Sequence, residues 1–365
     1  MPIEIESPES IGYEKILSNL AESSIRDLQF KDIGLRLSEL TLAYGDHVGK
    51  PELRSLISSF YPGIEADDVL LTAGAAGALF ILHTALLSDK DHLIVTRPNY
   101  ANNLETPRAV GCEISFVELL FEEEYRFSVE SIKKQLRPNT KMISITVPHN
   151  PTGTIIEESV LRSIAQLAAE KKISVLVDET YRELSFSNPP PLAATLGPHV
   201  VSVASLSKAY GIPGIRIGWI ITKSKEFQTT FLAAKEQIQI CNSVVDEEIA
   251  FQFLLRKEKY TADGKELVAR NFSALDRWIN NHRFLEWVRP GGGVIAFPRF
   301  KKEVDIDIEK FYDTLLNQYN TYVGPGHWFE QSKRHFRLGF GWEKHESFVK
   351  GLENIDHSIR DTLIR

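Results

Sequence analysis

A lysine and an arginine lie close together in a stretch shaped by proline and glycine. Lys208 follows the apolar run 200–204, and Pro213 and Gly214 form a turn just before Arg216. A lysine amine that is desolvated or crowded by other cations becomes a nucleophile and forms a Schiff base with a carbonyl group. The planar guanidinium of an arginine matches the oxygens of a phosphate. Together the two groups provide what pyridoxal phosphate, an aldehyde with a phosphate group, requires of a protein.

Other interpretations of this stretch stay open when it is taken alone. A lysine after a strand is commonly a solvated charge, and Pro-Gly is commonly only a turn. Ser205 and Lys208 also match the S-x-x-K pattern of serine acyl-enzymes. Those enzymes have S-D-N and K-T-G motifs as well, and this sequence contains neither string. We therefore disfavour an acyl-enzyme.

Short β-branched segments alternate with helical patterns through the first two thirds of the chain. Strands are predicted at 69–72, 92–96, 113–117, 142–147, 173–177 and 200–204. Helices are predicted at 75–87, after Tyr100, at 129–136 and at 157–170. This alternation is typical of an α/β three-layer sandwich, in which helices cover both faces of a mostly parallel central sheet.

The remaining segments predict two further parts. A long helical stretch over 227–256 leads out of the sheet, and strands at 294–298 and 335–340 then mix with helices at 260–280, 306–318 and 344–364. We expect an N-terminal segment at 1–44 that packs on the small domain and contains a helix over 11–28. A large cofactor-binding α/β domain is expected at 45–255, and a small α+β domain at 256–365.

Composition excludes several classes of protein. The chain has 365 residues, 43% hydrophobic and 25% charged, and a net charge of −7, which argues against a nucleic-acid partner or a membrane surface. No apolar run is long enough to span a bilayer. Cys112 and Cys241 form no metal-binding or disulfide pattern, so we expect no metal site. The acidic N-terminus lacks a secretion signal, and a cytoplasmic protein is expected.

Polar residues follow three of the predicted strands. Asn150 comes after one strand, Asp178 ends the next, and Ser205 and Lys208 follow a third. Ligands of open α/β sheets bind beyond the carboxyl ends of the strands, where these residues are expected to meet. A carboxylate at the end of an apolar strand needs a cationic partner, and a protonated pyridine nitrogen is one. The structural alternatives are a helix N-cap for Asp178 and a turn former for Asn150.

Small residues begin the helix predicted at 75–87. Gly74, Ala75 and Ala76 would let an anion approach the free backbone N–H groups at its start. Close packing of the helix against a neighbour would explain the same residues. Residues 74–76 taken alone are compatible with both anion binding and close packing.

From about residue 44 to residue 341 the sequence resembles the fold-type I pyridoxal-phosphate enzymes of the class I and II aminotransferase family. The matching motifs are Asn-Pro-Thr-Gly at 150–153, Asp-x-x-Tyr at 178–181 and Ser-x-Ser-Lys…Pro-Gly-x-Arg-x-Gly at 205–218. The resemblance implies transfer of the amino group of an α-amino acid to a 2-oxo acid through a Schiff base on Lys208. It implies that Asp178 pairs with the pyridine nitrogen.

The resemblance also implies the remaining contacts. Asn150 and Tyr181 would hydrogen-bond the phenolic oxygen of the cofactor, and Tyr100 would stack on its ring as a third catalytic residue. The phosphate would be held by Ala75, Ala76, Ser205, Arg216 and, from the second subunit of a homodimer, Tyr44.

The family's substrate-binding arginine matches Arg337, which together with Asn150 would bind the substrate α-carboxylate. The period-2 pattern at 335–340 supports this role independently. Arg337 shares a strand face with Gly339, and we expect this to leave room for a small ligand.

Departures from the family pattern leave alternatives open. His327 and Trp328 are bulky for a substrate channel, and the acidic cluster at 246–248 stands where many family members have a glutamine. His327, Glu247 or Asp246 could serve elimination, replacement or cyclisation at the β- or γ-carbon. The string at 19–23 resembles capreomycidine-synthase-like enzymes, which cyclise an arginine derivative. No second arginine for a dicarboxylate side chain is evident. A third hypothesis is a non-catalytic binding module that retains the fold.

Overall fold

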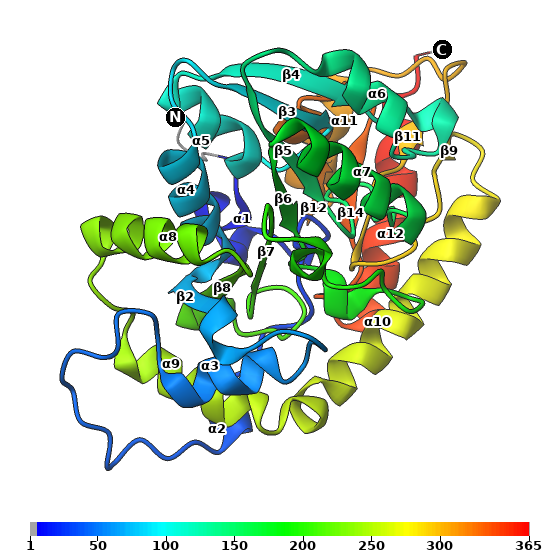
Figure 1. Ribbon diagram of the computed structural model, residues 1–365. Helices are drawn as coiled ribbons and strands as arrows, with labels where there is room; N and C mark the ends of the chain where they lie inside the picture. Colours follow the sequence, from blue (N-terminus) through cyan, green and yellow to red (C-terminus); the bar gives the residue numbers. More distant parts are fainter. Residues whose placement is uncertain (1–5, 365) are drawn as a thin grey trace.

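The computed structural model describes residues 6–364 and has a seven-stranded sheet at its centre (Figure 1). In spatial order the strands are β2 (Val69–Ala73), β8 (Ile217–Ile221), β7 (Val200–Ser205), β6 (Ser174–Asp178), β5 (Thr140–Thr146), β3 (His92–Arg97) and β4 (Glu113–Glu118). Only β8 in this sheet is antiparallel to its neighbours. The mostly parallel sheet is therefore confirmed.

Helices cover both faces of this sheet (Figure 1). Helices α4 (Gly74–Leu86), α5 (Asn102–Val110) and α8 (Lys225–Ile238) pack on one face, and α6 (Val129–Gln135) and α7 (Glu158–Lys171) on the other. Met142 joins the apolar core under α4, whereas its neighbour Ile143 joins the core under α7. Successive strand residues thus bury opposite faces, which produces the predicted three-layer sandwich.

The chain beyond residue 243 forms helices and small sheets of short strands beside the sandwich (Figure 1). The helices are α9 (Val244–Leu254), α10 (Lys257–Asn280), α11 (Ile308–Asn317) and α12 (His345–Thr362). One small sheet contains β10 (Ile295–Ala296), β14 (Phe336–Gly339) and β13 (Gly324–Pro325), and another pairs β9 (Leu285–Glu286) with β11 (Arg299–Phe300). The helical stretch predicted at 227–256 is two helices, because Ser243 caps a new helix start.

The N-terminal segment contradicts the helix predicted over 11–28. It contains α1 (Pro8–Ile11), a 3-10 turn η1 (Tyr13–Lys15) and strand β1 (Ser18–Asn19), which pairs in parallel with β12 (Thr321–Tyr322). Leu20 is fully buried, and the backbone N–H of Gly339 donates to its carbonyl at 2.7 Å. The apolar residues that suggested a helical face are therefore buried by distant parts of the chain. The domain boundaries at residues 44 and 255 stay predictions.

The other short elements connect these layers. Helices α2 (Phe30–Ile33) and α3 (Pro51–Ser58) precede the sheet. The remaining 3-10 turns are η2 (Ala66–Asp68), η3 (Phe121–Glu123), η4 (Arg182–Leu184), η5 (Ala193–Leu196), η6 (Pro213–Ile215) and η7 (Gly326–Phe329). Strand β8 was not predicted, because its first residues belong to a motif that we interpreted as a turn.

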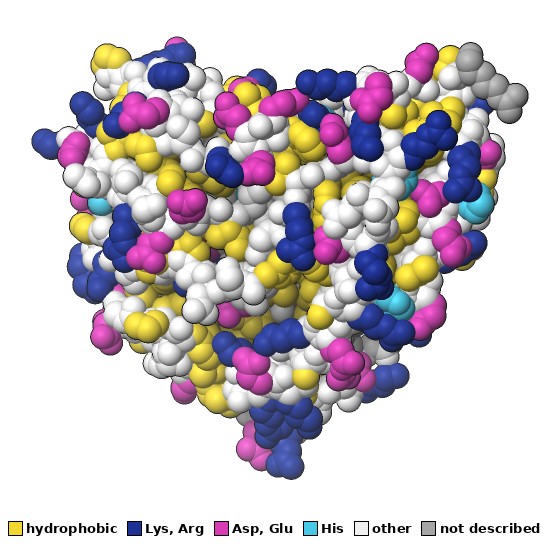
Figure 2. All heavy atoms as spheres, turned by 90° about the vertical axis from the view of Figure 1, so that its right-hand side faces the viewer, with side chains coloured by type: hydrophobic (Ala, Val, Ile, Leu, Met, Phe, Trp, Pro, Cys, Tyr) yellow, Lys and Arg dark blue, Asp and Glu magenta, His cyan; other side chains and the backbone are white. Residues whose placement is uncertain are grey.

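The surface has charges of both signs. Lys and Arg side chains are interspersed with Asp and Glu side chains over the face shown in Figure 2. No helix within residues 6–364 is long and apolar enough to cross a membrane. Among the same residues, no group of three or more His, Cys, Asp or Glu side chains is arranged to hold a metal ion.

Candidate active site

Polar side chains meet at the edge of the sheet where its six mutually parallel strands end. Asp178 is the last residue of β6 and Ser205 the last of β7. Strand β8 runs in the opposite direction, so its start lies at this same edge and Arg216 directly precedes it. Asp178, Ser205 and Arg216 line one cavity of about 650 Å³, together with Lys208. The convergence predicted from the strand ends is present in the structure.

The start of α4 and Arg216 lie side by side in this cavity. No side chain caps the first turn of α4, and Ala75 and Ala76 line the cavity. A Cβ atom on Gly218 would lie 2.7 Å from the Ala75 nitrogen, so glycine is required there for the strand to approach the helix. Arg216 Nη1 donates to the Pro213 carbonyl at 2.8 Å and to Ser207 Oγ at 3.4 Å. Free N–H groups and a guanidinium together suit a phosphate.

Asp178 is a buried carboxylate whose hydrogen bonds come from neutral groups. Its side chain is 6% exposed, and its Oδ1 accepts hydrogen bonds from the Thr180 backbone N–H at 3.1 Å and hydroxyl at 2.6 Å. Burial raises the pKa of Asp178, although the two Thr180 hydrogen bonds and the charge of Lys208 act to lower it. The Thr180 contact is a local turn and not a helix N-cap. A cation bound against this carboxylate would stabilise its charged form.

Lys208 extends into the cavity from the loop after β7. Its side chain is 30% exposed, and its Nζ lies 3.9 Å from Glu22 Oε1. The Lys208 carbonyl accepts a hydrogen bond from the Ile25 N–H at 3.1 Å, so the N-terminal segment fixes the backbone of the lysine loop. The amine therefore has solvent access and lies in ion-pair distance of the Glu22 carboxylate.

Arg337 is buried on β14 and faces Asn150. Arg337 Nη1 donates to Asn150 Oδ1 at 3.2 Å, and Nη2 donates to the Ala21 carbonyl at 2.9 Å. Its guanidinium carbon lies 5.0 Å from the centre of the Phe329 ring. Asn150 and Arg337 both line the cavity. The predicted pair is thus brought together at one wall.

The room that we expected beside Arg337 is present, because the cavity lies beside this residue. Gly339 does not provide that room. A Cβ atom on Gly339 would lie 1.7 Å from the Glu22 carbonyl oxygen, so the backbone of the N-terminal segment packs there. The period-2 pattern does not show what covers a strand face.

Two tyrosines complete the cavity, and a third lies outside it. Tyr100 and Tyr181 line the cavity, and burial raises the pKa of Tyr181 to about 12. Tyr44 is 82% exposed and is not among the lining residues of this chain. Its predicted role requires a second subunit and stays a prediction.

Several lining residues were not predicted. Five of them belong to the N-terminal segment: Glu6, Glu9, Tyr13, Glu22 and Asp27. No local pattern places them at the cavity, since contacts with distant parts of the chain, such as the pairing of β1 with β12, hold the N-terminal segment there.

The residues that depart from the family pattern divide into two groups. His327 and Trp328 line the cavity, where His327 Nε2 lies 2.6 Å from Glu6 Oε2 and Trp328 Nε1 donates to the same oxygen at 2.7 Å. Asp246 and Glu247 do not line it; Glu247 accepts hydrogen bonds from the Lys50 N–H and from Asn242. Of the three acid–base candidates His327, Asp246 and Glu247, His327 alone is placed to act on a ligand bound in this cavity.

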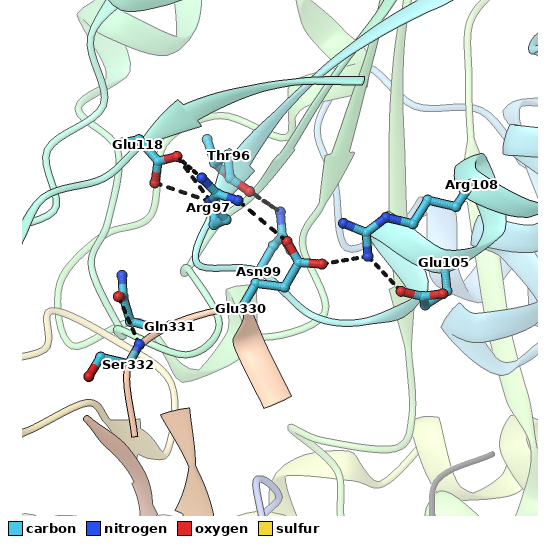
Figure 3. A network of polar contacts seen from close by, with 9 residues as sticks. All are labelled: Thr96, Arg97, Asn99, Glu105, Arg108, Glu118, Glu330, Gln331 and Ser332. Carbon is cyan, nitrogen blue, oxygen red and sulfur yellow. Dashed lines mark hydrogen bonds and ion pairs between the residues drawn. The ribbon is translucent and has the colours of Figure 1, made fainter. Parts of the chain in front are cut away.

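Charged side chains connect the residue after η7 to the sheet (Figure 3). Glu330 pairs with Arg108 and lies 3.6 Å from Arg97 Nη1. Arg97 also pairs with Glu118, and Arg108 Nη1 lies 2.6 Å from Glu105 Oε1. Glu330 lines the cavity, so these ion pairs join one of its walls to β3 and α5.

Comparison with known proteins identifies the family. The model of the family "Aminotransferase class I and II" matches residues 17–347. The chain belongs to the class I and II aminotransferase family. This match includes the segments that contain Lys208, Asp178 and Arg337.

Similar proteins have different named activities. Capreomycidine synthase of Streptomyces vinaceus is 25% identical over 353 residues, which cover 93% of this chain and 87% of that protein. A pyridoxal-phosphate-dependent aminotransferase from Streptococcus suis has 28% identity and a TM-score of 0.89, with 97% of this chain and 96% of that chain covered. The HTH-type transcriptional regulator NorG of Staphylococcus aureus is 25% identical, with 94% and 76% covered.

The cavity fits the cofactor of this family. Family members and the Streptococcus suis neighbour are pyridoxal-phosphate-dependent enzymes. The uncapped start of α4 with Arg216 matches a phosphate, and the buried Asp178 carboxylate matches a protonated ring nitrogen. The phosphate-matching residues and Asp178 line the same cavity, and Lys208 lines it too.

Proposed function

We propose that this protein is a pyridoxal-phosphate-dependent aminotransferase that moves the amino group of an α-amino acid to a 2-oxo acid. One observation carries the proposal: an amine (Lys208), a buried carboxylate (Asp178) and a buried arginine (Arg337) line a single cavity of about 650 Å³. When bound, the cofactor supplies an electron sink that makes the α-hydrogen of an amino acid acidic.

The residues at the strand ends would hold the cofactor. Asp178 would bind the ring nitrogen through a charge-assisted hydrogen bond. Asn150 and Tyr181 would hydrogen-bond the phenolic oxygen, and Tyr100 would cover the ring. The phosphate would be bound by the N–H groups of Ala75 and Ala76, by Ser205 and by Arg216.

Lys208 and Arg337 would act on the amino acid. Lys208 Nζ would take the α-proton and return it to a neighbouring carbon, since it is the one lysine amine among the described residues that line the cavity. Arg337 would bind the α-carboxylate, with Asn150 Oδ1 holding Nη1 in place. The α-carboxylate is then held in place while the proton moves at the adjacent α-carbon.

We further propose a homodimer. Leu42 and Tyr44 are 78% and 82% exposed, and Ile240 is 47% exposed. His47, three residues after Tyr44, contacts α8, with His47 Nδ1 2.6 Å from Glu236 Oε1. Exposed apolar side chains such as these favour a protein partner. A second copy covering them would bring Tyr44 to its phosphate-binding role, and sedimentation that gives a fully active monomer would contradict this.

Incubation of the holoenzyme with an amino donor and no acceptor tests the reaction type. Transamination predicts one equivalent of 2-oxo acid per active site, with continued turnover only after a 2-oxo acid is added. Release of ammonia or of a cyclised product over many turnovers without acceptor would contradict it.

The second candidate is elimination, replacement or cyclisation of an amino acid, including an arginine-derived one. Two observations favour it: His327 lines the cavity, and capreomycidine synthase is among the similar proteins. Such reactions need an additional acid or base near the side chain. His327→Gln should abolish product release under this candidate and leave transamination nearly unchanged.

A further inference from the structure

One wall of the cavity is acidic. Glu9, Glu22 and Asp27, all from the N-terminal segment, line the cavity beside Tyr13. The Glu22 side chain is 16% exposed, whereas Asp27 is more exposed. The Tyr13 hydroxyl donates to Glu9 Oε1 at 3.2 Å. Burial raises the pKa of Tyr13, and the surrounding carboxylates raise it further.

Aromatic and hydroxyl groups stand among these carboxylates. The Tyr13 ring stacks on Trp342 with a centroid distance of 6.0 Å, and Trp342 Nε1 donates to Asp27 Oδ2 at 2.8 Å. Ser24, which is 2% exposed, also lines the cavity. Carboxylates, a hydroxyl and an aromatic ring are the groups that bind organic cations.

The charges that would remain in the cavity after cofactor and substrate bind also favour a cationic ligand at the acidic wall. Besides His327, which is paired with Glu6, the described cations that line the cavity are Lys208, Arg216 and Arg337. If the proposed function holds, all three are engaged by cofactor and substrate carboxylate. Glu22 then loses the ammonium that lies 3.9 Å away. The positive charge of Arg26 acts to lower the pKa of Asp27, but Arg26 does not line the cavity.

We propose that Glu22, Asp27 and Tyr13 bind the positively charged end of the substrate side chain. The substrate is then an amino acid with a guanidinium or ammonium group, which Arg337 holds at the opposite, α-carboxylate end. A carboxylate side chain would be repelled by this wall. This inference rests on the proposed function, because it uses the same cavity and the same carboxylate anchor.

Calorimetric binding to the holoenzyme tests the inference without turnover. The probes are α-methylarginine and α-methylcitrulline, which have no α-hydrogen and differ in the charge of nearly isosteric side chains. We expect α-methylarginine to bind about tenfold or more tightly, as charge-assisted hydrogen bonds typically contribute. Glu22→Gln should reduce this preference about tenfold, and the more exposed Asp27→Asn about two- to fivefold.

The controls separate this inference from the proposed function. Glu14→Gln removes the same charge from an exposed residue of the same segment that does not line the cavity, and it should leave both affinities unchanged. Equal binding of the two probes, or equal loss of both in Glu22→Gln, would overturn the cation subsite. Failure of both probes to bind a cofactor-loaded protein would instead contradict the Arg337 anchor, and failure to bind the cofactor would contradict the proposed function.

Discussion

The two walls of the cavity are built in different ways. One wall consists of residues at strand ends of a single sheet, such as Asp178 on β6 and Ser205 on β7. The other consists of Glu22 from a loop near the N-terminus and Arg337 from a strand over 300 residues later. Strand ends are fixed by the hydrogen-bond ladder, whereas the second wall depends on contacts between distant segments. We expect the first wall to determine chemistry and the second to determine which amino acid binds.

Lys208→Ala gives the sharpest test of this division. Loss of the proton-transferring amine should reduce turnover by about 10²–10⁴-fold or more, while the rest of the cavity is retained. Lys223→Ala, which removes an amine that donates to the Gly63 carbonyl outside the cavity, serves as control. Rates of amino-acid conversion would show the difference. Equal rates in the two variants would place the chemistry elsewhere.

Asp178→Asn should affect turnover without abolishing cofactor binding. Removal of one preorganised charge partner typically costs about 10²–10³-fold in turnover. The matched control is Asp68→Asn, since Asp68 is also buried but does not line the cavity. Turnover and cofactor content are measured together. If Asp178→Asn had the wild-type rate, the carboxylate would have only the local turn with Thr180 as its role.

Arg337→Lys should affect binding more than chemistry, which would distinguish the two walls. An ammonium cannot reproduce the two donors of a guanidinium fork, so amino-acid affinity should fall about tenfold to a hundredfold. Arg334→Lys is the control, because Arg334 donates to backbone carbonyls away from the cavity. Titration of the holoenzyme with amino acid measures the change. An unchanged affinity would mean that the α-carboxylate is held by another group.

Glu330→Gln should give the smallest effect. The ion pairs of Glu330 with Arg97 and Arg108 are partly exposed, and such pairs contribute about 1 kcal/mol or less to the free energy of unfolding. The loss should shrink further at high salt. Denaturant unfolding, with Glu124→Gln at an exposed pair as control, measures it. A loss of several kcal/mol would show that this wall is held by its charges and not by packing.

The strand-end wall could be predicted from the sequence because its signals are local. Asp178 and Lys208 each follow an apolar strand within a few residues, and parallel strands bring such ends together. The second wall could not be predicted in the same way. Glu22 follows β1, whose pairing with β12 crosses most of the chain, and nothing in the surrounding sequence indicates that pairing.

The errors have the same origin. The helix expected over 11–28 was wrong because Leu20 is buried by distant elements and not by a helix of its own. The cavity lies beside Arg337 as expected, but Gly339 does not open it, since the backbone of Glu22 covers that glycine. Tyr44 stays a prediction, since the partner site that it is expected to complete belongs to another copy of the chain.

Borohydride reduction of the holoenzyme tests the central claim most directly. The reduced lysine–cofactor linkage survives digestion, so mass spectrometry identifies the modified peptide. We predict that the cofactor is attached to Lys208. Lys235 is the informative rival, because burial lowers its pKa to about 8, yet it does not line the cavity. Cofactor on the peptide that contains Lys235, or on any lysine other than Lys208, would contradict the account.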